Sequence, residues 1–466
     1  MSSAPIGATG AAADLHERAE ELLDRARAAG AAEAEVYGTG GTSLSAKMEK
    51  GDLGQVQADE GATLGLRVLI DGRLGFTSTN QLDAGALERA AADAVAIARL
   101  SPPDEANVLG SAASIDASRL LGPRVDPLLA GLDVAEVVER ARSLSAATSA
   151  HDGRISVDKA TVSSVAARTV LRTTTGIAFD DEDAALTMSV MALAKDGEDT
   201  GGFDYGGHVL RDLADADGAA ARLSARVARA VVGNLGARPG ESYEGPVAFA
   251  PEAFTTAFLG PLLGAVSALA VQRGRSALAE KHGEVVAPGI TILDDPTDRA
   301  SAGARPFDRE GTPTERLAIV QDGVLRSFLH NGYTAAVASS TSTGHAAGGP
   351  RGVPGLGAHA IQVETNAADS PEDEAALLRA LGSGLYVQRL SGSVDPASGD
   401  FSGAAKSARW IEGGEVRHSV QEVMVAGNAF DLLARGITIT RQRTRPTGNA
   451  LLPWALVPCI SVTGGS

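Results

Sequence analysis

The stretch P-E-A-F-T-T-A-F-L-G-P-L-L-G-A-V-S-A-L-A-V-Q-R-G-R-S-A-L-A-E-K-H-G-E, residues 251–284, predicts the element around which the chain is organised. One set of positions recurs at the three- and four-residue spacing of a helical face: Leu262, Val266, Leu269, Ala270 and Arg273. The stretch is nearly uncharged up to Arg273, which favours a buried helix. Pro261 lacks an amide proton, so we expect the helix to break or restart there.

Length, composition and charge narrow the class of protein. The chain has 466 residues, enough for two or three domains. It is 44% hydrophobic but only 4% aromatic, which predicts cores built from alanine, valine and leucine. A formal net charge of -17 opposes binding to nucleic acid or to an anionic membrane surface. The sequence contains no run of 18 apolar residues, so we expect no membrane span.

The cysteine content and the first residues bear on the compartment. A single cysteine, Cys459, excludes a disulfide framework within the chain and is typical of a reducing compartment, so we expect a cytoplasmic protein. Cys459 lies in a final apolar run, where a buried, unreactive thiol is expected. Residues 1–13 are small and polar and lack a basic region leading into an apolar one, which predicts a disordered tail rather than a secretory signal.

The pattern of strands and helices predicts an α+β protein in two major parts. Residues 14–238 predict an N-terminal α+β domain, whose short alternating runs between 34 and 79 form an antiparallel meander with a hairpin turn at Asp71-Gly72. The loop-rich segment 103–131 offers a subdivision of this domain. The segment G-A-R-P-G at 236–240 marks the main boundary. Residues 239–466 predict a β-rich domain built around the buried helix, and such segregated helices argue against βαβ winding.

Seven segments, spread over most of the chain in a fixed order, resemble those of a known family. They are L-G-L-R-V-L-I-D-G-R-L-G-F-T-S-T (64–79), Q-R-G-R-S-A-L (272–278), S-A-G-A-R-P-F-D-R-E-G-T-P-T (301–314), D-G-V-L-R-S-F-L-H-N-G-Y-T-A (322–335), G-L-Y-V (384–387), D-P-A-S-G-D-F-S-G (395–403) and V-A-G-N-A-F-D-L-L (425–433). Through them, the region from about Glu33 to Gly464 resembles the TldD/PmbA proteins, and more closely the PmbA (TldE) branch.

The resemblance implies that this chain lacks the zinc motif of the catalytic TldD branch. That branch carries H-E-x-x-x-H on the equivalent helix, where two imidazoles hold zinc and the glutamate activates the attacking water. Aligned on Leu259-Gly260, the three motif positions are occupied here by Thr256, Ala257 and Pro261. None of them is a zinc ligand or a general base. The resemblance therefore implies a non-catalytic subunit, with no cofactor in this chain and zinc in a partner subunit.

The same resemblance implies partners and substrates. A chain of this kind forms a heterodimer with a TldD-like, zinc-bearing subunit and completes the cavity that the zinc site faces. The pair degrades or trims unfolded or small peptides, including modified ones, and a homodimer is compatible with the chain on its own. Two other functions stay open: an independent enzyme of natural-product biosynthesis, and a partner-free regulatory or binding protein, as the older family name of gyrase modulator suggests.

Two of the shared segments contain candidate substrate- or partner-binding residues. Arg273, Arg275 and Ser276 follow the predicted helix, and arginine binds carboxylates through two parallel hydrogen bonds. The alternative is a solvated helix end, where the helix dipole favours positive charge. The other candidates lie between two glycines that allow close backbone approach: Asp400, Phe401 and Ser402. The alternative here is a tight turn that Asp400 caps.

The sequence contains only weak signatures of a metal site and none of a nucleotide site. None of the eight histidines has another within four residues, so no helical zinc pair is present. His345 and His359 lie in or beside a glycine-rich segment, 339–357, which leaves open a metal site assembled from distant histidines. The glycine-rich pieces match neither a phosphate-binding loop nor a dinucleotide fingerprint, so no nucleotide site is predicted.

Overall fold

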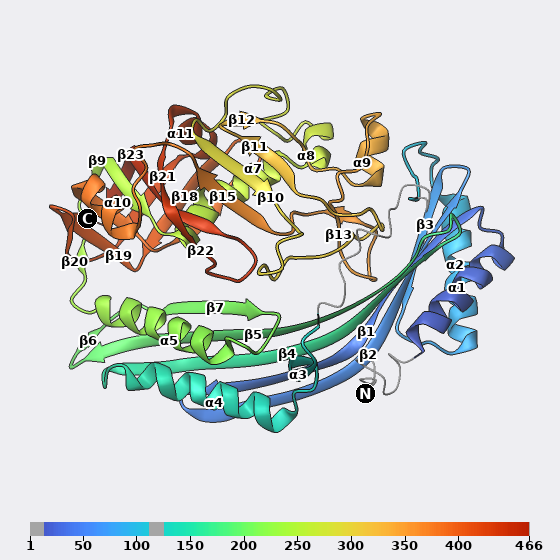
Figure 1. Ribbon diagram of the computed structural model, residues 1–466, viewed down its shortest axis with the longest axis horizontal. Helices are drawn as coiled ribbons and strands as arrows, with labels where there is room; N and C mark the ends of the chain where they lie inside the picture. The colour runs from blue at the N-terminus through green and yellow to red at the C-terminus, as the bar shows by residue number, and fades with distance from the viewer. Residues whose placement is uncertain (1–13, 111–124, 466) are drawn as a thin grey trace.

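The computed structural model describes residues 14–110 and 125–465. The predicted tail at 1–13 and residues 111–124 of the predicted loop-rich segment lie outside the described residues. Figure 1 shows the chain in two parts, a long curved sheet flanked by helices and a β-rich part beside it, with α5 (Ala216–Gly233) the helix of the first part nearest to the β-rich part. Both parts combine helices with strands, which confirms the α+β fold class.

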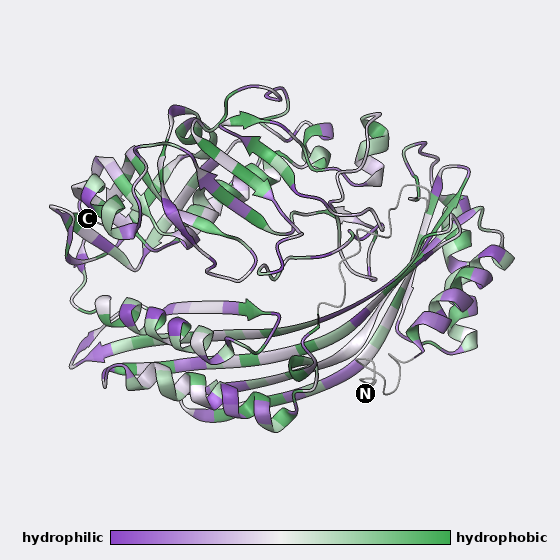
Figure 2. Cartoon of the chain, viewed as in Figure 1, coloured by the Kyte–Doolittle hydropathy of each residue, from purple (hydrophilic) through white to green (hydrophobic). Residues whose placement is uncertain are grey.

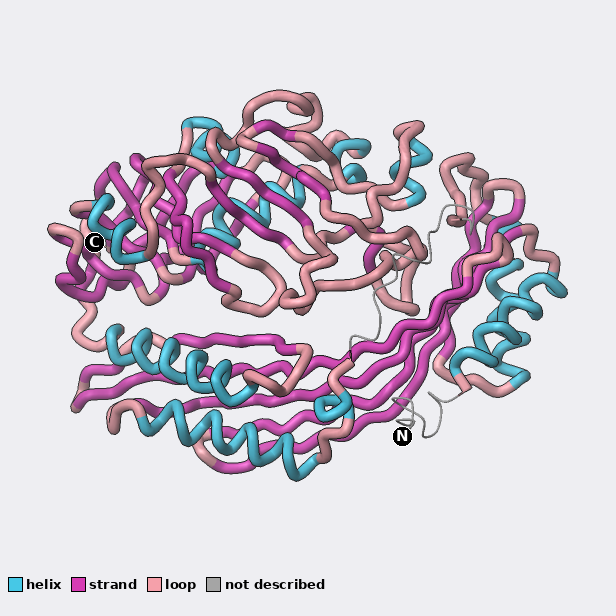
Figure 3. The backbone as a smooth tube through the Cα atoms, in the orientation of Figure 1, coloured by secondary structure: helices cyan, strands magenta, loops and turns pink. Residues whose placement is uncertain are grey.

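A seven-stranded sheet forms the first part, with long antiparallel strands that Figure 3 shows as one curved layer. Its order is β3-β2-β1-β4-β5-β6, and β7 also pairs with β5. The strands are β1 (Glu33–Glu49), β2 (Asp52–Ile70), β3 (Arg73–Thr79), β4 (Ile155–Thr173), β5 (Ala178–Asp196), β6 (Asp199–Thr200) and β7 (Asp204–Leu210). The predicted hairpin is present, because Asp71 and Gly72 both adopt the positive φ of a two-residue turn between β2 and β3.

The strands are longer than the sequence pattern predicts. The runs at 34–39 and 43–49 belong to one strand, β1, which passes through Gly40 and Gly41 without interruption. A Cβ atom at Gly41 would lie 2.1 Å from the carbonyl oxygen of Ala166 on β4. A glycine here permits close approach of two strands, as glycines inside strands often do, and does not end the strand.

The helices of the first part all pack on one face of this sheet. They are α1 (Leu15–Ala29), α2 (Ala84–Leu100), α3 (Pro127–Ala130), α4 (Val134–Ala150) and α5 (Ala216–Gly233). Val36 of β1 belongs to the same core cluster as α1 and α2, and Ala46 and Met48 belong to the cluster that includes α4 and α5. Even-numbered positions of one strand share a face, so the opposite face is left for the second part. Hydrophilic and hydrophobic stretches alternate along these helices, as expected for amphipathic segments (Figure 2).

The second part is built on a ten-stranded sheet with two smaller sheets. The large sheet contains β8 (Arg238–Pro239), β9 (Tyr243–Phe249), β16 (Ser383–Val387), β17 (Arg389–Val394), β18 (Asp400–Lys406), β19 (Ala408–Glu412), β20 (Glu415–Gln421), β21 (Val423–Asn428), β22 (Thr438–Thr444) and β23 (Leu452–Gly464). The smaller sheets contain β10 (Ile290–Asp294), β11 (Leu317–Gln321), β12 (Val324–Leu325) and β15 (Ile361–Thr365), and β13 (Ala346–Ala347) with β14 (Gly355–Leu356). Three further helices are α9 (Gly332–Val337), α10 (Glu374–Leu381) and α11 (Ala429–Arg435).

The organising stretch is helical and buried, but it is not one regular helix. It forms α6 (Pro251–Phe254), a π-helical turn η4 (Thr255–Leu259), α7 (Gly260–Ala265) and α8 (Ala268–Gln272). Phe254 and Phe258 lie in the core of the second part, with Phe258 edge-on to Phe249 and Phe401. One continuous helix over most of 251–284 is not formed, because Val266 and Ser267 interrupt the helix and turns follow Gln272.

Four buried charged side chains join the two parts of the chain. Arg67 on β2 donates to Glu35 on β1 at 2.7 Å and to Glu310 of the second part at 3.0 Å. Arg309, also of the second part, donates to Glu35 at 2.8 Å and lies 3.8 Å from the centre of the Tyr37 ring. Burial alone would raise the pKa of Glu35, but the Arg67 and Arg309 guanidiniums outweigh it and lower the pKa. These charges therefore compensate one another only when both parts are in place.

The structure bears on the predicted burial of Cys459 and on the predicted absence of a membrane span. Cys459 is exposed, so the expected buried thiol is wrong. It lies where the pairing of β23 with β9 shifts register, between Val457 and Ile460, which turns its side chain outward. Within the described residues, no helix combines the length and apolar character that a membrane crossing needs.

Candidate functional site

The three residues that the resemblance assigns to the zinc-motif positions lie on the π-helical turn and at the start of α7. Ala257 is completely buried and Pro261 is buried too, whereas Thr256 is half-buried and donates its hydroxyl to the carbonyl oxygen of Glu252 at 3.3 Å. The amide of Gly260 bonds to the carbonyl of Thr255, five residues back, as in a π-helix. Pro261 has no amide to donate, so the turn widens before it and the helix continues.

A pocket of about 580 Å³ opens beside the end of this helical stretch and contains two of the predicted site residues. We call it the α8 pocket. Its walls include Leu263 and Leu269 from the helices, Arg273 and Arg275 from the segment that follows, and Asp395 from the loop before β18. The amide of Ala277 donates to the carbonyl of Ala397 at 3.1 Å and ties these two segments together. The structure thus brings together two of the shared segments that are far apart in the sequence.

The two arginines of the α8 pocket are exposed and held by a fixed backbone turn. The amides of Gly274 and Arg275 donate to the carbonyls of Val271 and Ala270, with Gly274 at φ 64°, which is a Schellman motif at the end of α8. In the described part of the chain, neither Arg273 nor Arg275 forms an ion pair, so both guanidiniums are available to a ligand or partner. Ser276 differs, because its hydroxyl donates to the carbonyl of Ala265 at 2.6 Å and stabilises the turn.

The residues at the start of β18 are divided between surface and core. Asp400 accepts hydrogen bonds from Asn428 at 2.8 Å and from Ser398 at 2.9 Å, and the Asn428 amide, followed by Ser398, lowers its pKa. Phe401 is buried against Phe258, and Ser402 is exposed. Asp400 thus braces the loop that carries Asp395 into the α8 pocket, and Phe401 packs the core behind it.

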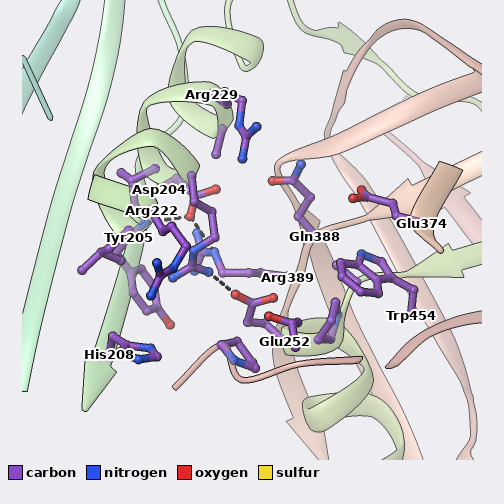
Figure 4. A pocket seen from close by; sticks show the side chains of 18 of the residues that line it. Asp204, Tyr205, His208, Arg222, Arg229, Glu252, Glu374, Gln388, Arg389 and Trp454 are labelled. Atoms are coloured by element: carbon purple, nitrogen blue, oxygen red, sulfur yellow. Dashed lines mark hydrogen bonds and ion pairs between the residues drawn. The ribbon is translucent and has the colours of Figure 1, made fainter. Parts of the chain in front are cut away.

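Sequence reasoning missed a second pocket, of about 500 Å³, between the two parts of the chain. We call it the α5 pocket. Arg222, Arg226 and Arg229 of α5 line one side, at the four- and three-residue spacing of one helical face, and residues of the second part such as Gln388 and Trp454 line the other (Figure 4). The spacing of these arginines on an alanine-rich helix is the feature of the sequence that could have indicated this face. Glu252, also in this pocket, lies one helical turn before Thr256.

The structure brings His345 and His359 together in a buried cluster. Their rings stack with centres 5.2 Å apart, and His345 lies 3.2 Å from a carboxylate oxygen of Asp294. Asp294 also accepts from the amides of His359 and Ala360, both at 2.7 Å. Thr343 lies 2.9 Å from the other nitrogen of His345, but its hydroxyl is already bonded to the backbone of His330. The order Thr-His-Asp resembles a nucleophile triad, yet every member is engaged in holding the loop.

We expect the histidine cluster to make stability depend on pH. Burial, followed by the nearby Arg305 charge, lowers the pKa of His359 to about 4, and the ring nitrogen lies 2.8 Å from the carbonyl of Gly344. Because the unfolded chain takes up this proton near the ordinary value of about 6.5, folding loses stability as the pH falls from about 6.5 towards 4. The His359→Gln variant keeps an N–H donor but cannot titrate. As the pH falls, this variant should therefore lose up to about 3 kcal/mol less free energy of unfolding than the parent.

Chemical denaturation of the parent and of His359→Gln at several pH values measures this effect. Burial and the Glu310 charge raise the pKa of Asp308 to about 7, which favours the folded state as the pH falls, but both proteins contain Asp308 and the difference between them removes its contribution. His151→Gln, at an exposed position, is the matched control. A difference curve that is as flat for His359→Gln as for His151→Gln would show that His359 is not the linked group.

Comparison with known proteins identifies the family. Three family models match in order: PmbA/TldA metallopeptidase domain 1 at residues 34–98, the central domain at 127–235 and the C-terminal domain at 242–464. The chain belongs to the PmbA/TldD family. Metalloprotease PmbA of Escherichia coli O157:H7 is 28% identical over 432 residues, which are 90% of this chain and 91% of that protein. The Metalloprotease PmbA homolog of Haemophilus influenzae is 27% identical over 91% of both chains.

Solved structures agree with the fold of this PmbA/TldD protein. TldE from Thermococcus kodakarensis superposes with a TM-score of 0.85 over 96% of this chain and 100% of its own, at 22% identity. A protein from Thermotoga maritima described as a putative modulator of a DNA gyrase superposes with a TM-score of 0.82 at 23% identity. At such identities the likeness concerns the fold.

The family name implies a metal, but the motif positions of this PmbA/TldD chain do not fit zinc. A methyl group at Ala257 and a pyrrolidine ring at Pro261 have no lone pair to offer, and the Thr256 hydroxyl is bonded to the helix backbone. Among the residues that the structure describes, no three or more histidine, cysteine, aspartate or glutamate side chains are grouped so that they could hold a metal ion.

Proposed function

We propose that this chain is a PmbA/TldE-type subunit of a peptidase, without catalytic zinc of its own. The observation that carries the proposal is the chemistry of the motif helix, where Thr256, Ala257 and Pro261 stand at the positions of two histidines and a glutamate in the catalytic branch. Its relatives are named metalloproteases, which supports a role in peptide hydrolysis. In this proposal a TldD-like partner supplies the zinc and the general base, and this chain completes the substrate cavity.

The substrates in this proposal are unfolded or small peptides, including modified ones. The exposed guanidiniums of Arg273 and Arg275 beside the α8 pocket suit a peptide carboxylate or an acidic loop of the partner. The net charge of -17 argues against nucleic acid as the ligand. We place the assembly in the cytoplasm, because a lone cysteine is typical of a reducing compartment.

Co-expression with a relative that carries H-E-x-x-x-H tests the proposal. We expect the two chains to sediment as one complex with an interface of roughly 2,000 Å² or more, and to hydrolyse peptides together. This chain alone, as monomer or homodimer, should contain no stoichiometric zinc by elemental analysis and show no turnover. A chelator should abolish the activity of the pair, as should replacement of the partner's motif glutamate by glutamine. One tightly bound zinc in this chain alone, or two independently sedimenting chains, would refute the proposal.

A further inference from the structure

The α5 pocket has an excess of positive charge in a protein that is strongly acidic overall. Six arginines line it, against three carboxylates from Asp204, Glu252 and Glu374, whereas the whole chain has a formal net charge of -17. Two of the arginines are neutralised within the pocket. Arg226 pairs with Glu252, and Arg389 lies 2.9 Å from Asp204 and 4.1 Å from the centre of the Tyr205 ring. The third carboxylate, Glu374, accepts a hydrogen bond from the neutral Tyr386 hydroxyl at 2.6 Å.

Of the other four arginines, two form ion pairs with acids outside the pocket and two form no ion pair in the part of the chain that the structure describes. Arg222 pairs with Asp215 and Arg445 pairs with Asp298, acids that do not line the pocket. Arg229 and Arg409 form no ion pair within the described ranges, 14–110 and 125–465. Arg229 is exposed on α5, and Figure 4 shows it on the wall opposite Gln388.

Arg409 is a buried cation whose hydrogen-bond partners are all neutral. Its guanidinium donates to the side-chain oxygen of Asn234 at 3.1 Å and to the carbonyls of Ala408 and Ala230 at 3.0 and 3.1 Å. The residue is only 6% exposed, and burial lowers its pKa. The Asp204 charge acts on Arg409 but also pairs with Arg389, so the two arginines share one carboxylate. Burial of this excess positive charge is costly, and an anion placed in the pocket would be held more firmly than one at an open surface.

The remaining walls suit a peptide better than a small inorganic ion. Tyr205, Leu378, Val416 and Trp454 supply aromatic and apolar surface, and the side-chain amide of Gln388 can both donate to and accept from a peptide backbone. The volume of about 500 Å³ lies within the range of roughly 300–1,000 Å³ typical of ligand sites. The pocket also lies between the two parts of the chain, a common place for ligand sites.

We propose that the α5 pocket binds a peptide through a carboxylate, which Arg229 contacts directly and which the buried Arg409 attracts. The carboxylate is either the C-terminus of the peptide or an acidic side chain. The identity of the ligand as a peptide rests on the function proposed above, whereas the anion preference rests on the arrangement of arginines alone.

Binding of fluorescein-labelled hexapeptides of glycine and alanine to the purified chain tests this proposal by anisotropy. The set contains a free C-terminal acid, the matching C-terminal amide, and an amide with one internal glutamate. We expect at least one carboxylate peptide to bind about tenfold more tightly than the plain amide, and the acid that binds identifies the source of the carboxylate. Arg229→Gln should weaken that binding about tenfold. Arg142→Gln, an exposed arginine of α4 outside the pocket, should leave it unchanged.

Three other results of this experiment would contradict the proposal. The proposal would be overturned if neither carboxylate peptide bound more tightly than the plain amide, if the Arg229→Gln effect were no larger than that of Arg142→Gln, or if inorganic phosphate bound tightly while none of the peptides bound. Melting temperatures of both variants verify that they are folded. Peptide binding is measured on this chain alone, so its absence would overturn the anion site without testing the proposed function. Failure of the paired chains to hydrolyse peptides would refute the proposed function without affecting the anion site.

Discussion

Replacement of Glu35 by glutamine should lower the free energy of unfolding by roughly 3–5 kcal/mol, the cost typical of breaking a buried ion pair by removing one partner. Glu35 is 1% exposed and accepts from Arg67 at 2.7 Å and from Arg309 at 2.8 Å. In Glu35→Gln, two buried guanidiniums would share the single carboxylate of Glu310. Glutamine keeps the shape of the side chain, so the loss measures charge and not a cavity.

Chemical denaturation of Glu35→Gln beside Glu33→Gln isolates this effect. Glu33 lies on the same strand and the same face, two residues away, but is exposed, so its replacement should change stability little. Since Arg309 and Glu310 belong to the second part, the variant should also weaken the connection between the parts and could separate their unfolding into two transitions. Equal midpoints for both variants would show that the buried charges contribute no net stability.

If the chain acts in the proposed peptidase pair, the double variant Arg273→Ala/Arg275→Ala should reduce kcat/KM of that pair by roughly a hundredfold, since a hydrogen bond to a charged group is worth about 1.5–3 kcal/mol and two such contacts would be lost. Both guanidiniums are exposed beside the α8 pocket, and the Schellman motif fixes the backbone that carries them. The melting temperature should stay nearly unchanged, because neither side chain supports the core. Turnover of one peptide with the zinc-bearing partner in excess measures the effect.

Arg435→Ala is the matched control for this double variant, because Arg435 is likewise exposed close to a helix end, in the last turn of α11, but does not line the α8 pocket. If Arg273 and Arg275 serve only as a solvated helix end, the double variant should lose about 0.3–1 kcal/mol of stability for each charge and keep its turnover, like Arg435→Ala. That result would remove both arginines from the binding site.

The sequence by itself was sufficient for the fold class and the family, and it is the source of the proposal that this chain lacks the zinc motif. Period-two and period-3.6 patterns are local, so the meander, its Asp71-Gly72 turn and the buried helical stretch could be read directly. The identity of Thr256, Ala257 and Pro261 likewise needs no coordinates. Local patterns were less reliable at glycines such as Gly41, where a close contact with β4, far away in the sequence, decides that the strand continues.

Only the tertiary structure decided which distant residues share an environment. The pairing of Glu35 with Arg309, and that of Arg67 with Glu310, each span more than two hundred residues of sequence, and no local pattern marks a charge as buried. The same holds for the α5 pocket, where the spacing of Arg222, Arg226 and Arg229 predicts one helical face but not that the face meets the second part of the chain. Burial and the compensation of buried charges arise from packing between residues far apart in the sequence. A sequence pattern shows which residues share one face of a helix or strand, but not what that face packs against.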